Sequence, residues 1–203
     1  MPTRGRTTLS SVIARVTYGK GIPGDDELRL LGDVSAGRRV LELGLAGNSV
    51  ALARAGAKAL AVDPDAEGLA DLRLEAAKEG VAVECHQGEL ADLGFAPSGT
   101  IDAVIACHTL HEEDDLGRTL RQVHRVLKPG TPLIMALDHP FAAVRLGRGA
   151  ALGGYGDDHR TIGELLTALD RANFRIEAFL ELGVDDKTPI PTTLIVKARK
   201  QGS

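Results

Sequence analysis

The sequence predicts an α/β fold in which helices cover both faces of a mostly parallel, seven-stranded sheet. Short apolar runs alternate with segments of helical periodicity from Val40 onward, which is the pattern of a doubly wound sheet. A turn containing Gly44 and Gly47 joins the first apolar run to a small-residue helix. The last two apolar runs are separated only by a loop with Gly183 and two prolines, which predicts a terminal antiparallel hairpin.

The expected strands are short runs rich in Val, Ile, Leu and Ala. They cover 40–43, 58–62, 81–85, 101–107, 132–137, 174–182 and 192–198. Helices are expected over 65–79, 114–127 and 161–172 because apolar residues recur there every three or four positions. Thr161 and Glu164 have the spacing of a capping box, and Asn173 stands where a left-handed helix end is expected. Residues 7–17 and 25–31 are expected to form a helical cap before the first strand.

The composition of the chain indicates which kinds of ligand or partner it can bind. The formal net charge is -4, only 3% of residues are aromatic and there is no Trp, so a nucleic-acid surface is not expected. No stretch approaches the roughly 18 apolar residues of a membrane span. Cys85 and Cys107 form no disulfide framework, which suits a reducing cytoplasm, and no metal-ligand set is visible. We therefore expect a cytoplasmic protein with a small-molecule partner and no metal, and a homodimer stays open.

The glycine turn is the first candidate site. Glycine lets the backbone approach a ligand closely, and the free N–H groups at the start of the next helix point into the same crevice. A plain strand-to-helix turn is the structural alternative, since a lone glycine loop is a weak signal.

Four segments in order give the turn a wider context. They are Leu41-Glu42-Leu43-Gly44, Asp63 ending the second strand, Gly88-Glu89-Leu90 after the third, and Leu127-Lys128-Pro129-Gly130 before the fifth. Together they resemble the class I S-adenosylmethionine-dependent methyltransferases, and Tyr18-Gly19 with Asp138-His139-Pro140-Phe141 is similar to the small-molecule group of that family. The resemblance implies a Rossmann-like methyltransferase fold, S-adenosylmethionine as cofactor, and methyl transfer to an O, N or C atom of a small molecule.

The resemblance also implies roles for the residues around the cofactor. The turn Gly44, Ala46 and Gly47 would pass the methionine part, with Glu42 as the acidic position near it. Asp63 would accept hydrogen bonds from the two ribose hydroxyls, for which a carboxylate with paired acceptor oxygens is suited.

The remaining cofactor positions lie at the ends of other strands. By the same resemblance Pro64 would pack on the adenine, Glu89 would contact its amino group and the N–H of Leu90 would meet a ring nitrogen. Cys107 would line the cleft with its backbone, while Tyr18 would either close over the cofactor or pack the cap onto the sheet.

Histidines supply the candidate catalytic groups. His139 and His111, with His108 nearby, are predicted beyond the carboxyl ends of strands, where side chains face the ligand crevice. His139 and His111 are each a candidate general base or substrate contact, or alternatively a solvated turn residue.

Two departures from the family pattern leave a second function open. Ala46 replaces a glycine of the usual triplet, and the interval from Gly44 to Asp63 is about two residues shorter than in the family, near the roughly 20 residues typical of such loops. A protein that binds the cofactor without methylating, as a cyclase-like catalyst or a binding module, is the alternative. A nicotinamide dehydrogenase fits less well because the turn lacks the G-x-G-x-x-G spacing.

We expect a single domain over 1–203. Residues 1–36 would form the helical cap, 37–140 the cofactor-binding core, and 141–203 a loop, the last helix and the terminal hairpin. Five glycines lie within 147–156, which predicts either a substrate lid or a plain surface connection.

Overall fold

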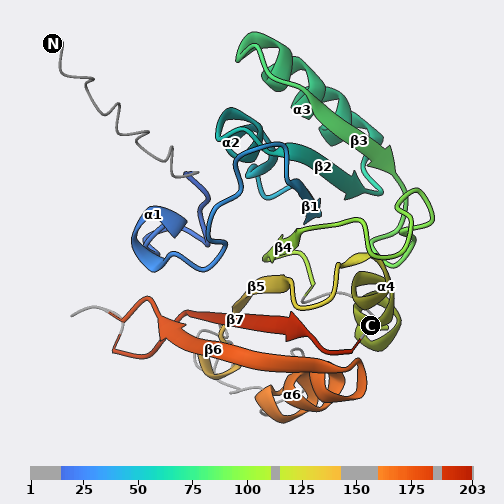
Figure 1. Ribbon diagram of the computed structural model, residues 1–203. Helices are drawn as coiled ribbons and strands as arrows, with labels where there is room; N and C mark the ends of the chain where they lie inside the picture. The colour runs from blue at the N-terminus through green and yellow to red at the C-terminus, as the bar shows by residue number, and fades with distance from the viewer. Residues whose placement is uncertain (1–14, 111–114, 143–159, 185–188, 203) are drawn as a thin grey trace, which may run out of the picture.

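A single seven-stranded sheet forms the centre of the molecule. The computed structural model describes residues 15–110, 115–142, 160–184 and 189–202. The strand order is β3-β2-β1-β4-β5-β7-β6, and Figure 1 shows the sheet with its terminal β6–β7 pair at one edge. The first five strands pair in parallel, whereas β7 is antiparallel to both β5 and β6. The expected doubly wound sheet with a terminal antiparallel hairpin is confirmed.

The element bounds follow the sequence pattern closely. The strands are β1 Arg39–Leu43, β2 Lys58–Asp63, β3 Val83–Gln87, β4 Ala103–Cys107, β5 Pro132–Asp138, β6 Phe174–Leu182 and β7 Thr193–Lys200. The helices are α1 Asp25–Leu28, α2 Ser49–Arg54, α3 Ala66–Lys78, α4 Leu116–Val126 and α6 Ile162–Arg171.

Alternating side chains of the strands build a separate core on each face of the sheet. Leu41 and Leu43 pack with α4 and α6, whose apolar stripes include Leu120 and Leu169. Val40, which precedes them, packs on the other face with the N-terminal segment and α2, and α3 covers the outer strands of that face. Because side chains alternate along a strand, Glu42 points to the α2 side of the sheet, which prepares its role in the site.

Side-chain caps fix where the longer helices begin. Asp65 and Asp115 accept backbone N–H bonds at the starts of α3 and α4. Thr161 and Glu164 form the predicted capping box of α6, and Asn173 adopts the predicted left-handed conformation with φ 62°. These boundaries are local properties of the sequence, which is why they could be predicted.

Three expected elements differ from the structure. The third strand begins at Val83 because the amide of Val81 still bonds to Ala76 at the end of α3. The fourth begins at Ala103, since Ile101 makes only an isolated bridge. In the cap, residues 7–14 lie outside the described residues, 15–17 are not helical, and the second helix is the single turn α1, which ends at left-handed Arg29.

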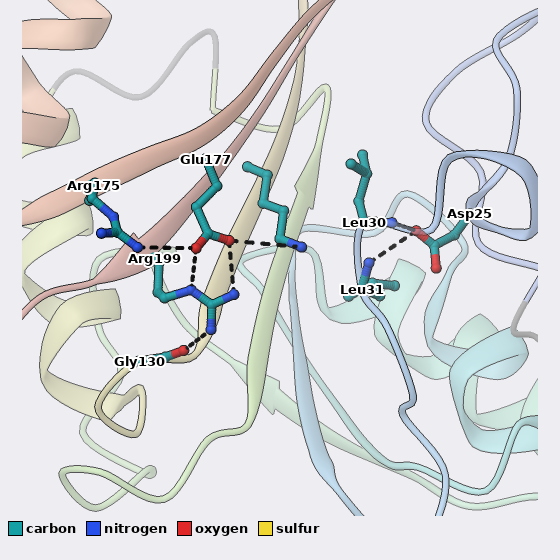
Figure 2. Close-up of polar contacts among 8 residues, drawn as sticks. Asp25, Leu30, Leu31, Gly130, Arg175, Glu177 and Arg199 are labelled. Carbon is teal, nitrogen blue, oxygen red and sulfur yellow. Dashed lines mark hydrogen bonds and ion pairs between the residues drawn. The ribbon is translucent and has the colours of Figure 1, made fainter.

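An ion-pair cluster fastens the terminal hairpin. Glu177 of β6 accepts two hydrogen bonds from the Arg199 guanidinium of β7, at 2.5 and 2.9 Å, and Arg199 also donates to the Gly130 carbonyl before β5. Figure 2 shows this cluster, with Arg175 on its outer side. The hydrogen bonds from Arg199 hold the pKa of Glu177 below its ordinary value. None of the helices in the described part of the chain has the length and apolar character that crossing a bilayer requires.

Candidate functional site

The candidate site lies where β1, β2 and β4 end, at the carboxyl edge of the sheet. In open α/β sheets ligands bind at this edge, where the strand order reverses on either side of the first strand. Here β2 and β4 flank β1, so the turn after β1 lies at such a point. In that turn Gly44 and Gly47 both have positive φ, 82° and 85°, which favours glycine at both positions.

The Glu42 carboxylate holds the turn together from beneath. It is 1% exposed, and one oxygen accepts the Asn48 amide at 3.0 Å, while the other accepts the Ser49 amide at 2.8 Å and the Ser49 hydroxyl at 2.5 Å. Burial raises the pKa of Glu42 despite the opposing effect of these hydrogen bonds. Both oxygens are therefore used inside the turn, which shows how a short loop carrying Ala46 is stabilised.

The two glycines of the turn have different surroundings. A Cβ placed on Gly44 would overlap the Thr109 side chain, with 2.6 Å to its Cβ, whereas one on Gly47 would meet no atom within 4 Å. Thr109 is held there by its hydroxyl, which donates to the Leu43 carbonyl at 2.7 Å. The lack of a side chain at Gly44 therefore allows the turn to pack closely against the loop after β4. Gly47 is exposed and forms the open side of the turn.

The ends of β2 and β3 lie side by side. Oδ1 of Asp63 accepts the Asp65 amide at 2.8 Å, and among the described residues no hydrogen bond reaches its Oδ2. The Gly88 amide donates to the Asp63 carbonyl at 3.1 Å, which brings the segment with exposed Glu89 and buried Leu90 beside it. The side-chain amide of Gln87 donates to the backbone carbonyl of Pro64 at 3.5 Å, and Pro64 is exposed. The four predicted residues Asp63, Pro64, Glu89 and Leu90 are thus brought together.

The N-terminal segment is tied to the glycine turn by a contact that sequence reasoning missed. The Asn48 side chain accepts from the Thr17 amide at 2.9 Å and donates to the Thr17 carbonyl at 3.2 Å, so it pairs with the backbone like a neighbouring strand. Asn48 is 1% exposed. A polar residue at a helix start was the available signal, but its partner lies 31 positions away.

Tyr18 packs the cap instead of pointing at the cleft. Its fully buried hydroxyl donates to Asp25 at 2.7 Å, and the same carboxylate oxygen accepts the amides of Leu30 and Leu31. Figure 2 shows the two leucine amides converging on Asp25. Burial and the Asp25 charge raise the pKa of Tyr18. Of the two expected uses of Tyr18, this geometry favours packing.

Cys107 ends β4 under the turn and is nearly fully buried. Desolvation, and next the charge of Glu42, raise the pKa of its thiol to about 12. At neutral pH the thiol is protonated and is no nucleophile.

The histidines are used differently from one another. His139 is 2% exposed; its Nδ1 accepts the Phe141 amide at 3.2 Å, so its Nε2 donates to Glu181 at 2.8 Å. Both nitrogens are engaged, so acting as a base would require one bond to break. His111 lies outside the described residues, as does the glycine-rich stretch 147–156. His108 instead contacts the N-terminal segment through Tyr18.

Comparisons with known proteins agree with this geometry. Residues 41–135, from β1 into β5, match the family model described as a methyltransferase domain. A ubiquinone biosynthesis O-methyltransferase of Sodalis glossinidius is 35% identical over 96 residues, which are 46% of this chain and 39% of that protein. The chain thus aligns with about two fifths of the length of this curated relative.

Solved structures extend the likeness over most of the chain. An S-adenosylmethionine-dependent methyltransferase from Mesorhizobium loti has a TM-score of 0.69 at 25% identity, covering 85% of this chain and 95% of that one. The cyclase SpnF has a TM-score of 0.68 at 19% identity, covering 88% and 82%, and shares the fold.

Proposed function

We propose that this chain, a member of the class I S-adenosylmethionine-dependent methyltransferase family, transfers the cofactor's methyl group to an oxygen atom of a small molecule. The family and its cofactor follow from the matched domain and the structural likeness. The oxygen acceptor is inferred from the curated relatives, which are named O-methyltransferases. We also propose that 1–36, 37–140 and 141–203 act as cap, core and acceptor side of one domain.

The observation that carries the proposal is the placement of Asp63. It stands at the end of β2 with one carboxylate oxygen bound in its own turn and the other receiving no hydrogen bond from the described residues. An oxygen in that position is suited to accept from a ribose diol. The exposed Pro64 ring and the Gly88–Leu90 backbone lie beside it, as an adenine would require. The residues present therefore fit the nucleoside part of the cofactor.

When bound, the cofactor would supply a methyl group on a positively charged sulfur. The acceptor oxygen would form the new bond to the methyl carbon, and the sulfur would leave with the electrons of the broken C–S bond. The protein's contribution to such a displacement is mainly positioning. We assign the Gly44–Gly47 turn to the methionine part through its open side at Gly47, because both oxygens of the Glu42 carboxylate already accept hydrogen bonds within the turn. Glu42 then acts on the cofactor through the shape of the turn.

The acceptor hydroxyl must also lose its proton. In the described residues of this edge, both nitrogens of His139 and of His108 are hydrogen bonded, and the Cys107 thiol is a very weak acid. We therefore propose an acceptor with a weakly acidic hydroxyl, such as a phenol, which needs little help from a base.

Calorimetric titration with S-adenosylmethionine and S-adenosylhomocysteine tests the cofactor site. Asp63→Asn keeps the turn acceptor but removes the charge, so the affinity for either ligand should fall by about ten-fold or more. Asp65→Asn is the matched control, because Asp65 caps α3 through the Glu67 amide at 3.0 Å and should leave the affinity unchanged. Equal affinities of wild type and Asp63→Asn would refute the assignment.

A non-methylating use of the same site is the second candidate. One observation favours it: the Glu42 carboxylate accepts hydrogen bonds within the turn, and Thr109 fills the space beside Gly44. Assays with phenolic acceptors distinguish the two. Formation of S-adenosylhomocysteine that depends on the acceptor supports methyl transfer, whereas tight cofactor binding without turnover over the whole acceptor panel supports the second candidate.

A further inference from the structure

His108 bridges two segments at the carboxyl edge of the sheet. It follows the last residue of β4 directly. Its Nδ1 lies 2.8 Å from Oδ1 of Asp138, the last residue of β5, and its Nε2 lies 2.9 Å from the Tyr18 carbonyl oxygen. The Tyr18 oxygen comes from a segment 90 positions earlier in the chain. The ring therefore connects the end of the sheet to the N-terminal segment.

The backbone of His108 is held in an unfavourable conformation to make this bridge. Its φ is 56°, in the left-handed region that few residues other than glycine adopt. The His108 amide bonds to the Ala136 carbonyl at 2.7 Å, which anchors the residue to β5. Strained side-chain-bearing residues of this kind persist where surrounding contacts fix them, and they concentrate at functional sites.

The partner segment fits closely against the ring. A Cβ placed on Gly19 would lie 2.8 Å from His108 Nε2, and Gly19 has φ 136°. Two residues earlier, the backbone N–H and the carbonyl of Thr17 are both hydrogen bonded to the Asn48 side chain. We call residues 16–19 the strap. It is fastened to the glycine turn at Thr17 and to the end of β4 at Tyr18.

We propose that His108, oriented by Asp138, is a positioning residue that holds the strap across the ends of β1 and β4 and thereby retains the cofactor. The inference rests on the proposed function, because the strap lies beside the turn assigned to the methionine part. Asp138 fixes the ring orientation through Nδ1, and the ring fixes the carbonyl of Tyr18 through Nε2. In this role neither residue needs to touch the reacting atoms.

The test compares His108→Asn with His124→Asn. Asparagine tolerates the left-handed backbone at 108 but is too short to replace both ring contacts. His124 is the matched control: it is also half-buried and bonds a distant backbone carbonyl, that of Gln201, at 2.9 Å. It lies on α4, outside the strap and the assigned cofactor residues.

Hydrogen exchange in the unliganded protein gives the first readout. His108→Asn should speed exchange of the Thr17 amide, which bonds Asn48, and of the Asp25 amide, which bonds Val16, by about ten-fold. Stopped-flow dissociation of S-adenosylhomocysteine gives the second, with a rate about ten-fold faster. His124→Asn should change neither, and its melting temperature measures the general destabilisation that loss of a histidine contact causes. Asp138→Ala should reproduce the effect of His108→Asn. Asp138→Asn should largely keep wild-type behaviour, because its amide NH2 can donate to Nδ1 while the Nε2–H of His108 still donates to the Tyr18 carbonyl.

Each outcome decides between alternatives. Unchanged exchange in His108→Asn overturns the proposal that His108 holds the strap. Faster exchange with an unchanged dissociation rate shows that the strap does not retain the cofactor, which also overturns it. If wild-type protein binds no S-adenosylhomocysteine, the proposed function fails, and the exchange comparison still reports on the His108 contact.

Discussion

The carboxylate of Glu42 accepts both the backbone amide and the hydroxyl of Ser49, at 2.8 and 2.5 Å, across the turn that joins β1 to α2. The acidic residue of the first strand is thus an internal cap for the helix that follows it. Carboxylates commonly accept hydrogen bonds from the unpaired N–H groups at the start of a helix. Here it explains how the short loop keeps its shape although Ala46 stands in place of one of the family's glycines.

Replacing Glu42 by Gln should lower the free energy of unfolding by about 1–2 kcal/mol at acidic pH. The amide NH2 brings two donor hydrogens to a site where the Asn48 and Ser49 amides need acceptors, whereas a protonated carboxyl brings one, which can turn to the Ser49 hydroxyl. The pKa of Glu42 is raised from 4.5 by burial. A carboxyl with a raised pKa in the folded state keeps its proton there after the unfolded chain has lost it, so its contribution to stability falls as pH rises above 4.5. Glutamine has no such loss.

Urea unfolding of both proteins from about pH 5 to about pH 8 measures the difference. The advantage of wild type over Glu42→Gln should shrink as the pH rises and should level off once the folded-state carboxyl is ionised. A difference that grows with pH would mean that the ionised carboxylate is the form that folding favours.

The two glycines of the turn offer a second comparison. Gly47→Ala should cost about 1 kcal/mol, the price of a positive φ alone, since no atom stands near its added Cβ. Gly44→Ala should cost about 3 kcal/mol or more, because the same backbone penalty is joined by overlap with Thr109. Urea unfolding gives both values, and equal costs would show that Thr109 moves aside freely.

Local patterns carried most of the fold prediction. The capping box of Thr161 and Glu164 and the left-handed Asn173 involve residues within a few positions of each other, so the sequence displays them directly. The order of glycine turn, Asp63 and Gly88–Leu90, with the family resemblance it carries, likewise pointed to the carboxyl edge of the sheet as the candidate site. These features depend on spacing alone.

Long-range polar contacts could not be predicted in the same way. Thr17 and Asn48 are 31 positions apart, and His108 and Tyr18 are 90 apart. Many polar residues of the chain could have been the partner, and only the folded backbone selects one. The same limit applies to Glu42, whose position was identified but whose engagement with Ser49 depends on how the turn closes.

The thiol of Cys107 should be unreactive in the folded protein. With a pKa of about 12, a fraction on the order of 10⁻⁴ is thiolate at about pH 8, and the side chain is 4% exposed. Burial also raises the pKa of Cys85, but that residue is only half-buried on β3. Iodoacetamide should therefore label Cys85 first, and Cys107 should be labelled at an appreciable rate only after unfolding.

Mass spectrometry of the two cysteine peptides, with and without urea, measures this order. Cys107→Ala keeps the strand backbone and removes the core packing of the sulfur and a 3.6 Å contact to it from the Asn48 side-chain amide, so the affinity for S-adenosylhomocysteine should change by less than about three-fold. Labelling of native Cys107 as fast as Cys85 would contradict the raised pKa. A large loss of affinity in Cys107→Ala would instead assign the side chain, and not the backbone alone, to the cofactor cleft.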